Sequence, residues 1–296
     1  MKNGKSGWSF GALVAGAVTG LAIAERRRAL RAASRAGGRN IEARPHHNRL
    51  ITNLAIAGIT AAVSQLAMTP VVGPLSKWTE RRGVGLTQRL PLPRWARDVV
   101  AVLLLDYTLY WWHVLEHRAP LLYRFHQVHH ADLELDVSTA VRFHAGEFIA
   151  SVPWRAAQIV VIGASPRAFA HWQRLTMLSV LFHHSNVRLP IALERRLAAL
   201  VVTPRLHGIH HSNVAAEQDS NWSSGLTLWD RAHGTLRANV PQDEIEIGVA
   251  AYRHPRDVSL ARSLAMPFEP LPSRGLQAGT ARRRARSLTP ITRLRA

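Results

Sequence analysis

Histidine is concentrated in the middle of this chain, at spacings that can bind metal. The sequence has 16 histidines and no cysteine among its 296 residues, and 12 of the histidines lie between His113 and His211. Imidazole nitrogens suit zinc, copper, iron and nickel. The lack of thiolates excludes disulfides, cysteine-zinc sites and iron–sulfur clusters. A nitrogen-rich metal site is therefore the leading hypothesis.

Three short motifs hold most of these histidines. They read His113-Val-Leu-Glu-His117, His126-Gln-Val-His129-His130 and His207-Gly-Ile-His210-His211. Residues three or four apart share one face of a helix, so His113 and His117 can reach one metal. By the same rule His126 pairs with His129, whereas His130 points about a hundred degrees away. Each His-x-x-His-His triplet can therefore serve two metals, and a dinuclear centre with open positions is predicted.

Two other functions fit part of this pattern. His113-Val-Leu-Glu116-His117 matches the H-x-x-E-H pattern of inverted zinc metalloproteases, in which the glutamate is the general base. That interpretation leaves both triplets unused, so we expect Glu116 to lie beside the ligands or to face solvent. The second alternative is a non-enzymatic membrane protein that binds zinc or iron.

Apolar segments place the histidines at a membrane. The formal charge of +19 accompanies no nucleic-acid-binding signature, so we expect no nucleic-acid partner. Residues 1–24 are predicted to form a membrane anchor, with a cleaved signal peptide as the alternative, and the following Glu25-Arg26-Arg27-Arg28 is expected on the cytoplasmic side. Residues 50–72 are a second span bent near Pro70, or a re-entrant hairpin. A connection over 73–97 leads to the third apolar helix, 99–112, which delivers His113 and His117.

Later segments return the chain to the same side of the membrane. Residues 147–164 and 168–182 are predicted to form a short hairpin that dips into the bilayer and leaves His183-His184 on the original side. The arginine-rich run Ala281–Arg286 is typical of a disordered basic tail. The predicted class is an all-α, multi-pass integral membrane bundle with a cytoplasmic helical cap, which holds the histidine-rich dimetal site.

The motifs resemble the fatty acid hydroxylase/sterol desaturase superfamily. The resemblance is carried by Asp106-Tyr, Tyr110-Trp-Trp-His113-x-x-x-His117, His126-x-x-His129-His130, Phe182-His-His184-Ser-Asn186 and Thr203-Pro-Arg-Leu-His207-x-x-His210-His211. Asp219-Ser-Asn221 and Leu228-Trp229-Asp230-Arg231 resemble the closing motif. The similarity divides the chain into an N-terminal anchor and basic linker (1–49), a hydroxylase/desaturase-like domain (50–240) and a C-terminal extension (241–296).

The resemblance implies a set of metal ligands. They are His113, His117, His126, His129, His130, His207, His210 and His211, with one more from His183-His184, where His184 is favoured. Related hydroxylases place a ligand one turn earlier in that helix, where this chain has Ser179 or Val180. His144 lies in Arg142-Phe-His-Ala-Gly-Glu147, which resembles Arg-x-His-Pro-x-Glu with Ala145 in place of proline. It is expected beside the ligands or in a structural role, and Asn186 is a candidate additional ligand or a neighbour of the ligands. Candidates to orient the imidazoles are Asp106, Glu147, Asp219 and Asp230.

The resemblance also implies an activity. Such proteins are membrane oxidoreductases that use two irons, O2 and two electrons to hydroxylate or desaturate a lipid in lipid biosynthesis. Zinc can replace iron in isolated protein. The implied partners are a membrane lipid as substrate and a separate ferredoxin- or cytochrome-like electron donor, with the active site facing the cytoplasm.

Overall fold

The computed structural model describes residues 3–31 and 46–272, and the regular elements within these ranges are helices joined by loops. Within these ranges β structure is limited to isolated bridges, which confirms the all-α class. The basic run Ala281–Arg286 and most of the basic linker lie outside the described residues. The long helices are α1 (Asn3–Arg27), α2 (His46–Ala67), α3 (Thr69–Arg82), α5 (Arg94–Arg118), α6 (Pro120–His130), α7 (Ala145–Ile162) and α8 (Pro166–His184). The short ones are α4 (Leu86–Arg89), α9 (Ile191–Ala198), α10 (Pro204–His210), α11 (Ala215–Gln218), α12 (Leu228–Ala232), α13 (Leu260–Ala265) and the 3-10 turns η1 (Thr139–Val141), η2 (Gln242–Glu244), η3 (Pro255–Val258) and η4 (Met266–Phe268).

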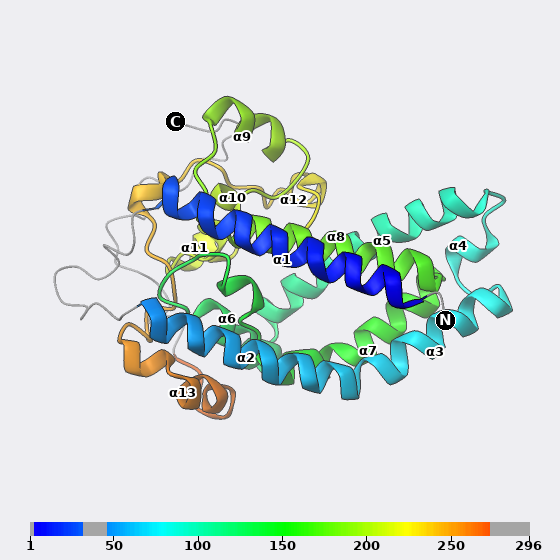
Figure 1. Ribbon diagram of the computed structural model, residues 1–296, viewed down its shortest axis with the longest axis horizontal. Coiled ribbons are helices and arrows are strands. Elements are labelled where there is room, and N and C mark those ends of the chain that lie inside the picture. The colour runs from blue at the N-terminus through cyan, green and yellow to red at the C-terminus, as the bar shows by residue number, and fades with distance from the viewer. Residues whose placement is uncertain (1–2, 32–45, 273–296) are drawn as a thin grey trace.

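The long helices form an elongated bundle, and the short ones form a cap at one end of it (Figure 1). Helices α1, α2, α5, α7 and α8 run along the long axis, while α6 and α9 to α13 gather at the cap end. An apolar core between α5, α7 and α8 includes Leu105, Ile159 and Trp172. Two of the described helices are long and apolar enough to cross a membrane, namely Asn48–Ala67 and Arg94–Arg118. Together these features give the predicted helical bundle.

The second apolar stretch breaks where a proline predicts it. Helix α2 ends at Ala67, and α3 begins at Thr69 with Pro70 in its first turn. Proline fits that turn because the first N–H groups of a helix have no intrahelical partner. The expected connection over 73–97 is itself largely helical, since α3 continues to Arg82 and α4 follows it. Helices α2 and α3 therefore lie end to end along one edge of the bundle (Figure 1).

The predicted hairpin is a pair of helices, α7 and α8, joined by a tight turn. Gly163 ends α7 with a φ of 77°, a left-handed conformation that glycine adopts without steric cost. Ser165 caps α8 by accepting a hydrogen bond from the Ala168 N–H at 3.0 Å. Helix α7 packs on α2 and α3, whereas α8 packs on α5. The turn returns the chain to the cap end, where α8 delivers His183 and His184.

The C-terminal residues up to 272 pack onto the helices that carry the histidines. Ile245 and Ile247 contact Ile209 of α10 in one apolar cluster. Val258 and Met266 pack against Val128 of α6 in another. The described part of this segment thus completes the cap around α6 and α10.

Candidate metal centre

The structure brings the histidines of the motifs into two buried groups. The first group is His113, His117, His126, His130 and His210, and the second group is His129, His184, His207 and His211. Within each group the candidate ligand atoms all lie within 4.8 Å of one another. Helices α5, α6, α8 and α10 supply these side chains, so residues far apart in sequence meet at the cap end of the bundle. The groups adjoin, since the His129 and His130 rings lie 5.5 Å apart.

Each triplet divides between the two groups, but not as its spacing predicted. The expected pairing of His126 with His129 is wrong, because His126 shares the first group with His130 and His129 joins the second. In α10 His207 likewise pairs with His211 rather than with His210. In both triplets the residues four apart share a group, which is the closer match to the 3.6-residue helical turn.

The nitrogen positions fit a bound metal. In the second group the Nε2 atoms of His184 and His129 lie 2.9 Å apart, and His207 Nε2 lies 3.0 Å from both His184 Nε2 and His211 Nε2. Imidazole nitrogens bound to one metal at about 2.0–2.1 Å lie roughly 3 Å from each other. In the first group His117 Nε2 and His210 Nε2 are buried without a hydrogen-bond partner, as a metal ligand would be.

Backbone carbonyls hold the outer nitrogens of several rings. Nδ1 of His113 donates to the Trp222 carbonyl at 2.7 Å, and Nδ1 of His210 donates to the Ser220 carbonyl at 2.9 Å. Nδ1 of His184 donates to the Val180 carbonyl at 2.8 Å. A hydrogen bond at Nδ1 fixes the tautomer that leaves Nε2 as a lone-pair donor to metal. One turn earlier in α8, where related hydroxylases place a ligand, the Val180 carbonyl thus supports His184. The Ser179 hydroxyl instead donates to the Ser224 carbonyl at 2.6 Å.

Burial keeps these imidazoles neutral. It lowers the pKa of His129, His130, His207 and His211 well below the usual value, and charge repulsion between neighbouring rings adds to the effect. Burial lowers the pKa of His210 to about 3. A neutral imidazole is the form that binds a metal, so these histidines need not lose a proton before they bind metal at neutral pH.

Carboxylates lie behind one of the candidate ligands. His126 Nδ1 is 3.4 Å from Glu147 Oε2 and 3.7 Å from Glu116 Oε2, whereas His126 Nε2 lies 3.2 Å from His130 Nε2 inside the first group. Glu147 therefore lies where it can orient the His126 imidazole. Glu116 does not face solvent, since it is only 4% exposed. Both carboxylates lie on the outer side of His126, away from the other nitrogens of its group.

The remaining histidines lie outside the two groups. The His183 ring lies against that of His207, with centroids 4.0 Å apart and a tilt of 45°, but of His183 and His184 only His184 joins the second group. His144 caps α7, since its Nδ1 accepts a hydrogen bond from Gly146 N at 3.0 Å, which is a structural role. His171 is exposed on α8. His233 stacks on Tyr110 at 5.0 Å.

Asp230 and Asp106 accept hydrogen bonds from groups other than the clustered imidazoles. Asp230 accepts hydrogen bonds from the N–H groups of Trp222 and Ser223 at 2.9 and 3.0 Å, and so positions the Trp222 carbonyl that holds His113. Asp106 instead accepts from Trp229 Nε1 at 2.7 Å and fastens α12 to α5.

Asp219 and Asn186 also bind groups other than the clustered imidazoles. Asp219 lies 3.8 Å from the Arg118 guanidinium. Asn186 Oδ1 accepts from the Arg31 N–H at 2.9 Å, and its Nδ2 donates to the Arg31 carbonyl at 2.8 Å. Asn186 is therefore a link to the N-terminal segment.

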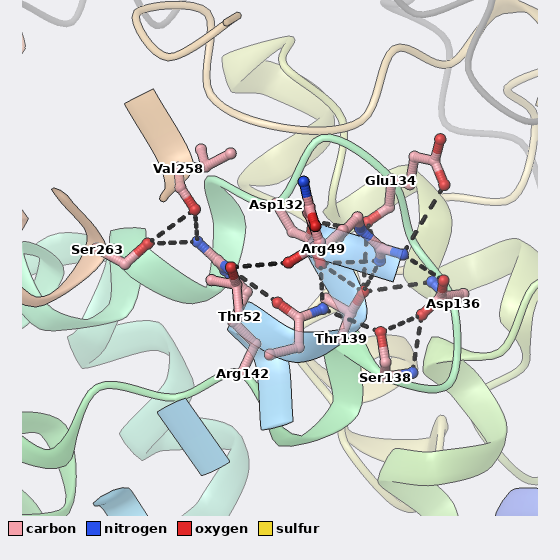
Figure 2. Close-up of polar contacts among 12 residues, drawn as sticks. Arg49, Thr52, Asp132, Glu134, Asp136, Ser138, Thr139, Arg142, Val258 and Ser263 are labelled. Atoms are coloured by element: carbon pink, nitrogen blue, oxygen red, sulfur yellow. Dashed lines mark hydrogen bonds and ion pairs between the residues drawn. The ribbon is translucent and has the colours of Figure 1, made fainter. Parts of the chain in front are cut away.

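Arg142 braces the region around His129, and Figure 2 shows its guanidinium beside Val258 and Ser263. Its carbonyl accepts from His129 Nδ1 at 3.2 Å. Its guanidinium donates to the Val128 carbonyl at 2.9 Å, to Asn53 Oδ1 at 2.8 Å and to Ser263 Oγ at 2.7 Å. One side chain thereby joins α6, α2 and α13. Spacing did not reveal this role, although Arg142 opens the Arg-x-His motif that the sequence displays.

Arg49, which the sequence places in a basic linker, is buried beside the same network (Figure 2). It makes a two-point contact with Asp132, with Nε–Oδ1 at 2.7 Å and Nη2–Oδ2 at 2.9 Å, and it also pairs with Asp136. Burial alone would raise the pKa of Asp132, but Arg49 and Arg142 outweigh it and hold that pKa at about 2. The loop after His130 is therefore held to α2 by charged hydrogen bonds.

Comparison with known proteins gives a consistent set of relatives. Residues 99–235 match the family model described as fatty acid hydroxylase. Ornithine lipid hydroxylase OlsE of Rhizobium tropici is 30% identical over 151 residues, which are 51% of this chain and 45% of that protein. Alkylglycerol monooxygenase of Homo sapiens is 27% identical over 138 residues, which are 47% of this chain and 30% of that protein. Cholesterol 25-hydroxylase-like protein of Danio rerio is 30% identical over 142 residues, which are 47% of this chain and 55% of that protein.

The chain spans between 30% and 55% of the length of these three curated relatives. No solved structure matches it. The family match nevertheless includes all members of both histidine groups. The match of residues 99–235 to the fatty acid hydroxylase family therefore agrees with the resemblance that the motifs carry.

Proposed function

We propose that this protein is a membrane oxygenase that uses two irons and O2 to hydroxylate or desaturate a lipid. The observation that carries the proposal is the pair of adjoining groups, with five and four buried histidines, inside the family-matched segment. The relatives named above are, by name, a lipid hydroxylase, a monooxygenase of alkylglycerols and a cholesterol 25-hydroxylase-like protein. Their shared theme favours a lipid as the substrate here.

The ligand set suits redox-active iron. Histidine nitrogens are neutral, so two irons bound there would keep a high positive charge and would supply the chemistry by which O2 and two electrons oxidise a C–H bond. In a hydroxylation one oxygen atom enters the lipid and the other leaves as water after taking up two protons. The chain's own contribution is to fix the rings through Nδ1 and to exclude water around them. Zinc remains the metal expected to replace iron in isolated protein.

Access and partners follow from the position of the site. The first group lies where α5 meets the cap, and α5 is one of the two helices able to cross a membrane. A lipid chain would reach the centre laterally, between the bundle helices. We propose that electrons come from a separate ferredoxin- or cytochrome-like protein that binds the cap, and that the cap faces the cytoplasm.

The zinc-protease alternative is disfavoured by the position of Glu116. A general base in such a site must reach a metal-bound water. Glu116 instead faces the outer nitrogen of His126, which points away from the first group. A passive zinc- or iron-binding protein remains the second candidate, and oxidation of a lipid separates it from the oxygenase.

Metal content and lipid analysis test the proposal. Purified protein should contain about two irons per chain when iron is supplied, and cells that express it should accumulate a hydroxylated or desaturated lipid detectable by mass spectrometry. His129→Ala should lower metal content and abolish the product, because His129 belongs to the second group. His171→Ala is the matched control, since it removes an exposed imidazole from α8 and should change neither. Wild-type protein that binds metal yet oxidises no lipid with O2 and a reductant would support the passive metal protein.

A further inference from the structure

The end of α1 and the residues that follow it pack beside α8 and α10, which carry clustered histidines, although they lie outside the family-matched residues. The Leu30 N–H donates to the Asn186 carbonyl at 2.7 Å, and the Arg188 N–H donates to the Arg28 carbonyl at 2.7 Å. Glu25 Oε2 accepts from the Asn186 N–H at 2.9 Å. Residues 25–31 therefore run beside the strand-like residues that immediately follow α8 and its histidines.

Arg31 extends this contact to the helix that carries the second histidine box, His207–His211. The side chain is only 6% exposed. Its Nη1 donates to the Pro204 carbonyl at 3.1 Å and to Gln242 Oε1 at 2.7 Å. Gln242 Nε2 in turn donates to the Arg205 carbonyl at 3.2 Å. Arg31 and Gln242 together hold two successive carbonyls in the first turn of α10.

The guanidinium also occupies space that a larger residue in α10 would need. A Cβ atom added to Gly208 would lie 2.2 Å from Arg31 Nη1 and 2.9 Å from Arg31 Cζ. Contacts that short cannot be tolerated without movement of one partner. Gly208, between His207 and Ile209, is thus the position where Arg31 lies directly against the helix backbone.

Helix α10 needs such outside support. It has only seven residues, and its N-cap Thr203 makes no side-chain capping bond. A helix of two turns is unstable on its own, because nucleation costs more than a few hydrogen bonds return. His207 and His211 belong to the second group and His210 to the first. The placement of α10 therefore sets ligands for both groups.

The charge on Arg31 has partners in this buried place. Burial lowers the pKa of Arg31 to about 10, with the nearby Glu194 acting in the opposite direction, so the guanidinium stays charged at neutral pH. Glu194 is itself fully buried. Arg31 is thus a buried cation, although burial and the neighbouring Arg205 both disfavour its charge.

We propose that Arg31 is a positioning residue for the metal centre, acting through α10 to hold His207, His210 and His211 in place. The inference rests on the proposed dimetal function. It assigns to the N-terminal segment a part in metal binding, where the sequence suggests only an anchor and a linker. Because Arg31 lies against Gly208, variants at these two positions can test its role through metal affinity, without an activity measurement.

The experiment compares Arg31→Ala, Gly208→Ala and the double variant in detergent-purified full-length protein. Metal affinity is measured by chelator competition, and the Co2+-loaded protein is compared by its visible spectrum. Arg31→Ala should weaken metal binding by about tenfold or more and alter the spectrum, as loss of a support behind metal ligands typically does. Gly208→Ala should weaken it as well. The double variant should bind metal about as well as Arg31→Ala alone, because the added methyl group then enters the space that Arg31 leaves.

Two further variants control for charge and for folding. Arg28→Ala removes the same charge from an exposed position three residues earlier and should leave affinity and spectrum unchanged. Arg31→Lys should restore most of the affinity, because a single nitrogen, Nη1, makes both hydrogen bonds. If Arg31→Ala does not fold, the Lys variant and Gly208→Ala still decide the question.

The outcomes separate this inference from the proposed function. Wild-type protein that binds no metal contradicts the dimetal proposal itself. Wild-type protein that binds metal, with Arg31→Ala showing the same affinity and Co2+ spectrum, overturns only the role of Arg31. Simple additivity of Arg31→Ala and Gly208→Ala would likewise exclude the direct contact on which the inference depends.

Discussion

His126 differs from the other clustered histidines in having carboxylates behind it. Its Nδ1 lies 3.4 Å from Glu147 Oε2, whereas His113, His184 and His210 donate to backbone carbonyls. A carboxylate partner makes an imidazole a stronger donor to metal. Glu147→Gln keeps the shape but removes the carboxyl group, so we expect metal binding about 10- to 100-fold weaker by chelator competition. Ser151→Ala, one turn further along α7, is the control, and equal affinities for both variants would contradict this role for Glu147.

The sequence predicts which histidines gather at the metal centre, but it does not predict all the residues that hold them in place. Histidine spacing brings His113 and His117 together correctly, because it depends only on local helix geometry. It misassigns the partners of His126 and His207, since which of two nearby positions faces a site depends on how each helix packs. Arg142 and Arg31 could not be found by spacing, because their partners lie up to 121 and 211 residues away.

At the scale of elements, the loop from α6 to α7 depends on Arg49 for its place. Arg49 binds Asp132 in a two-point contact and also pairs with Asp136, and Asp132 is only 1% exposed. Arg49→Met leaves a buried carboxylate without its main partner, which typically costs about 3–5 kcal/mol. We expect a lower thermal unfolding midpoint in detergent. Arg94→Met, at an exposed position, should leave the midpoint unchanged, and a similar small effect for both variants would show that the network adds little stability.

Helix positions follow from the sequence where apolar runs and prolines coincide. The break between α2 and α3 falls at Met68, next to the predicted bend at Pro70. The helical character of residues 73–97 was not predicted, because charged residues interrupt the segment and its buried positions include polar residues such as Thr79 and Thr87. Helices α10 and α12 are too short to give a periodic signal, and contacts such as that of Asp106 with Trp229 define them instead.

For the whole molecule, the bundle follows from composition, whereas the closure of the cap does not. Apolar stretches predict α2, α5 and the α7–α8 pair, and the histidines predict that α5 and α8 end at one place. Residues 241–272 show no periodic pattern. They nevertheless complete the core, since Ile247 packs on Ile209 and Met266 on Val128. Such packing depends on surfaces that exist only after the helices have come together.

The shared direction of the helices makes a prediction about membrane topology. Arg49 at the start of α2 contacts Asp132 beside the histidines, so the apolar stretch Asn48–Ala67 leads away from the cap. Its 20 residues would cover about 30 Å, the thickness of a bilayer core. Arg82 at the end of α3 and Arg196 in α9 of the cap are both exposed and should therefore lie on opposite sides of the membrane.

The chain has no cysteine, so single cysteines can report each side directly. With a membrane-impermeant maleimide, Arg82→Cys should react in intact cells. Arg196→Cys should react only after the membrane is opened, because the cap is proposed to face the cytoplasm. The reverse pattern would place the metal centre outside. Labelling of both positions from one side would mean that α2 enters and leaves the same leaflet, as a re-entrant segment, and that a lipid reaches the histidines from that leaflet alone.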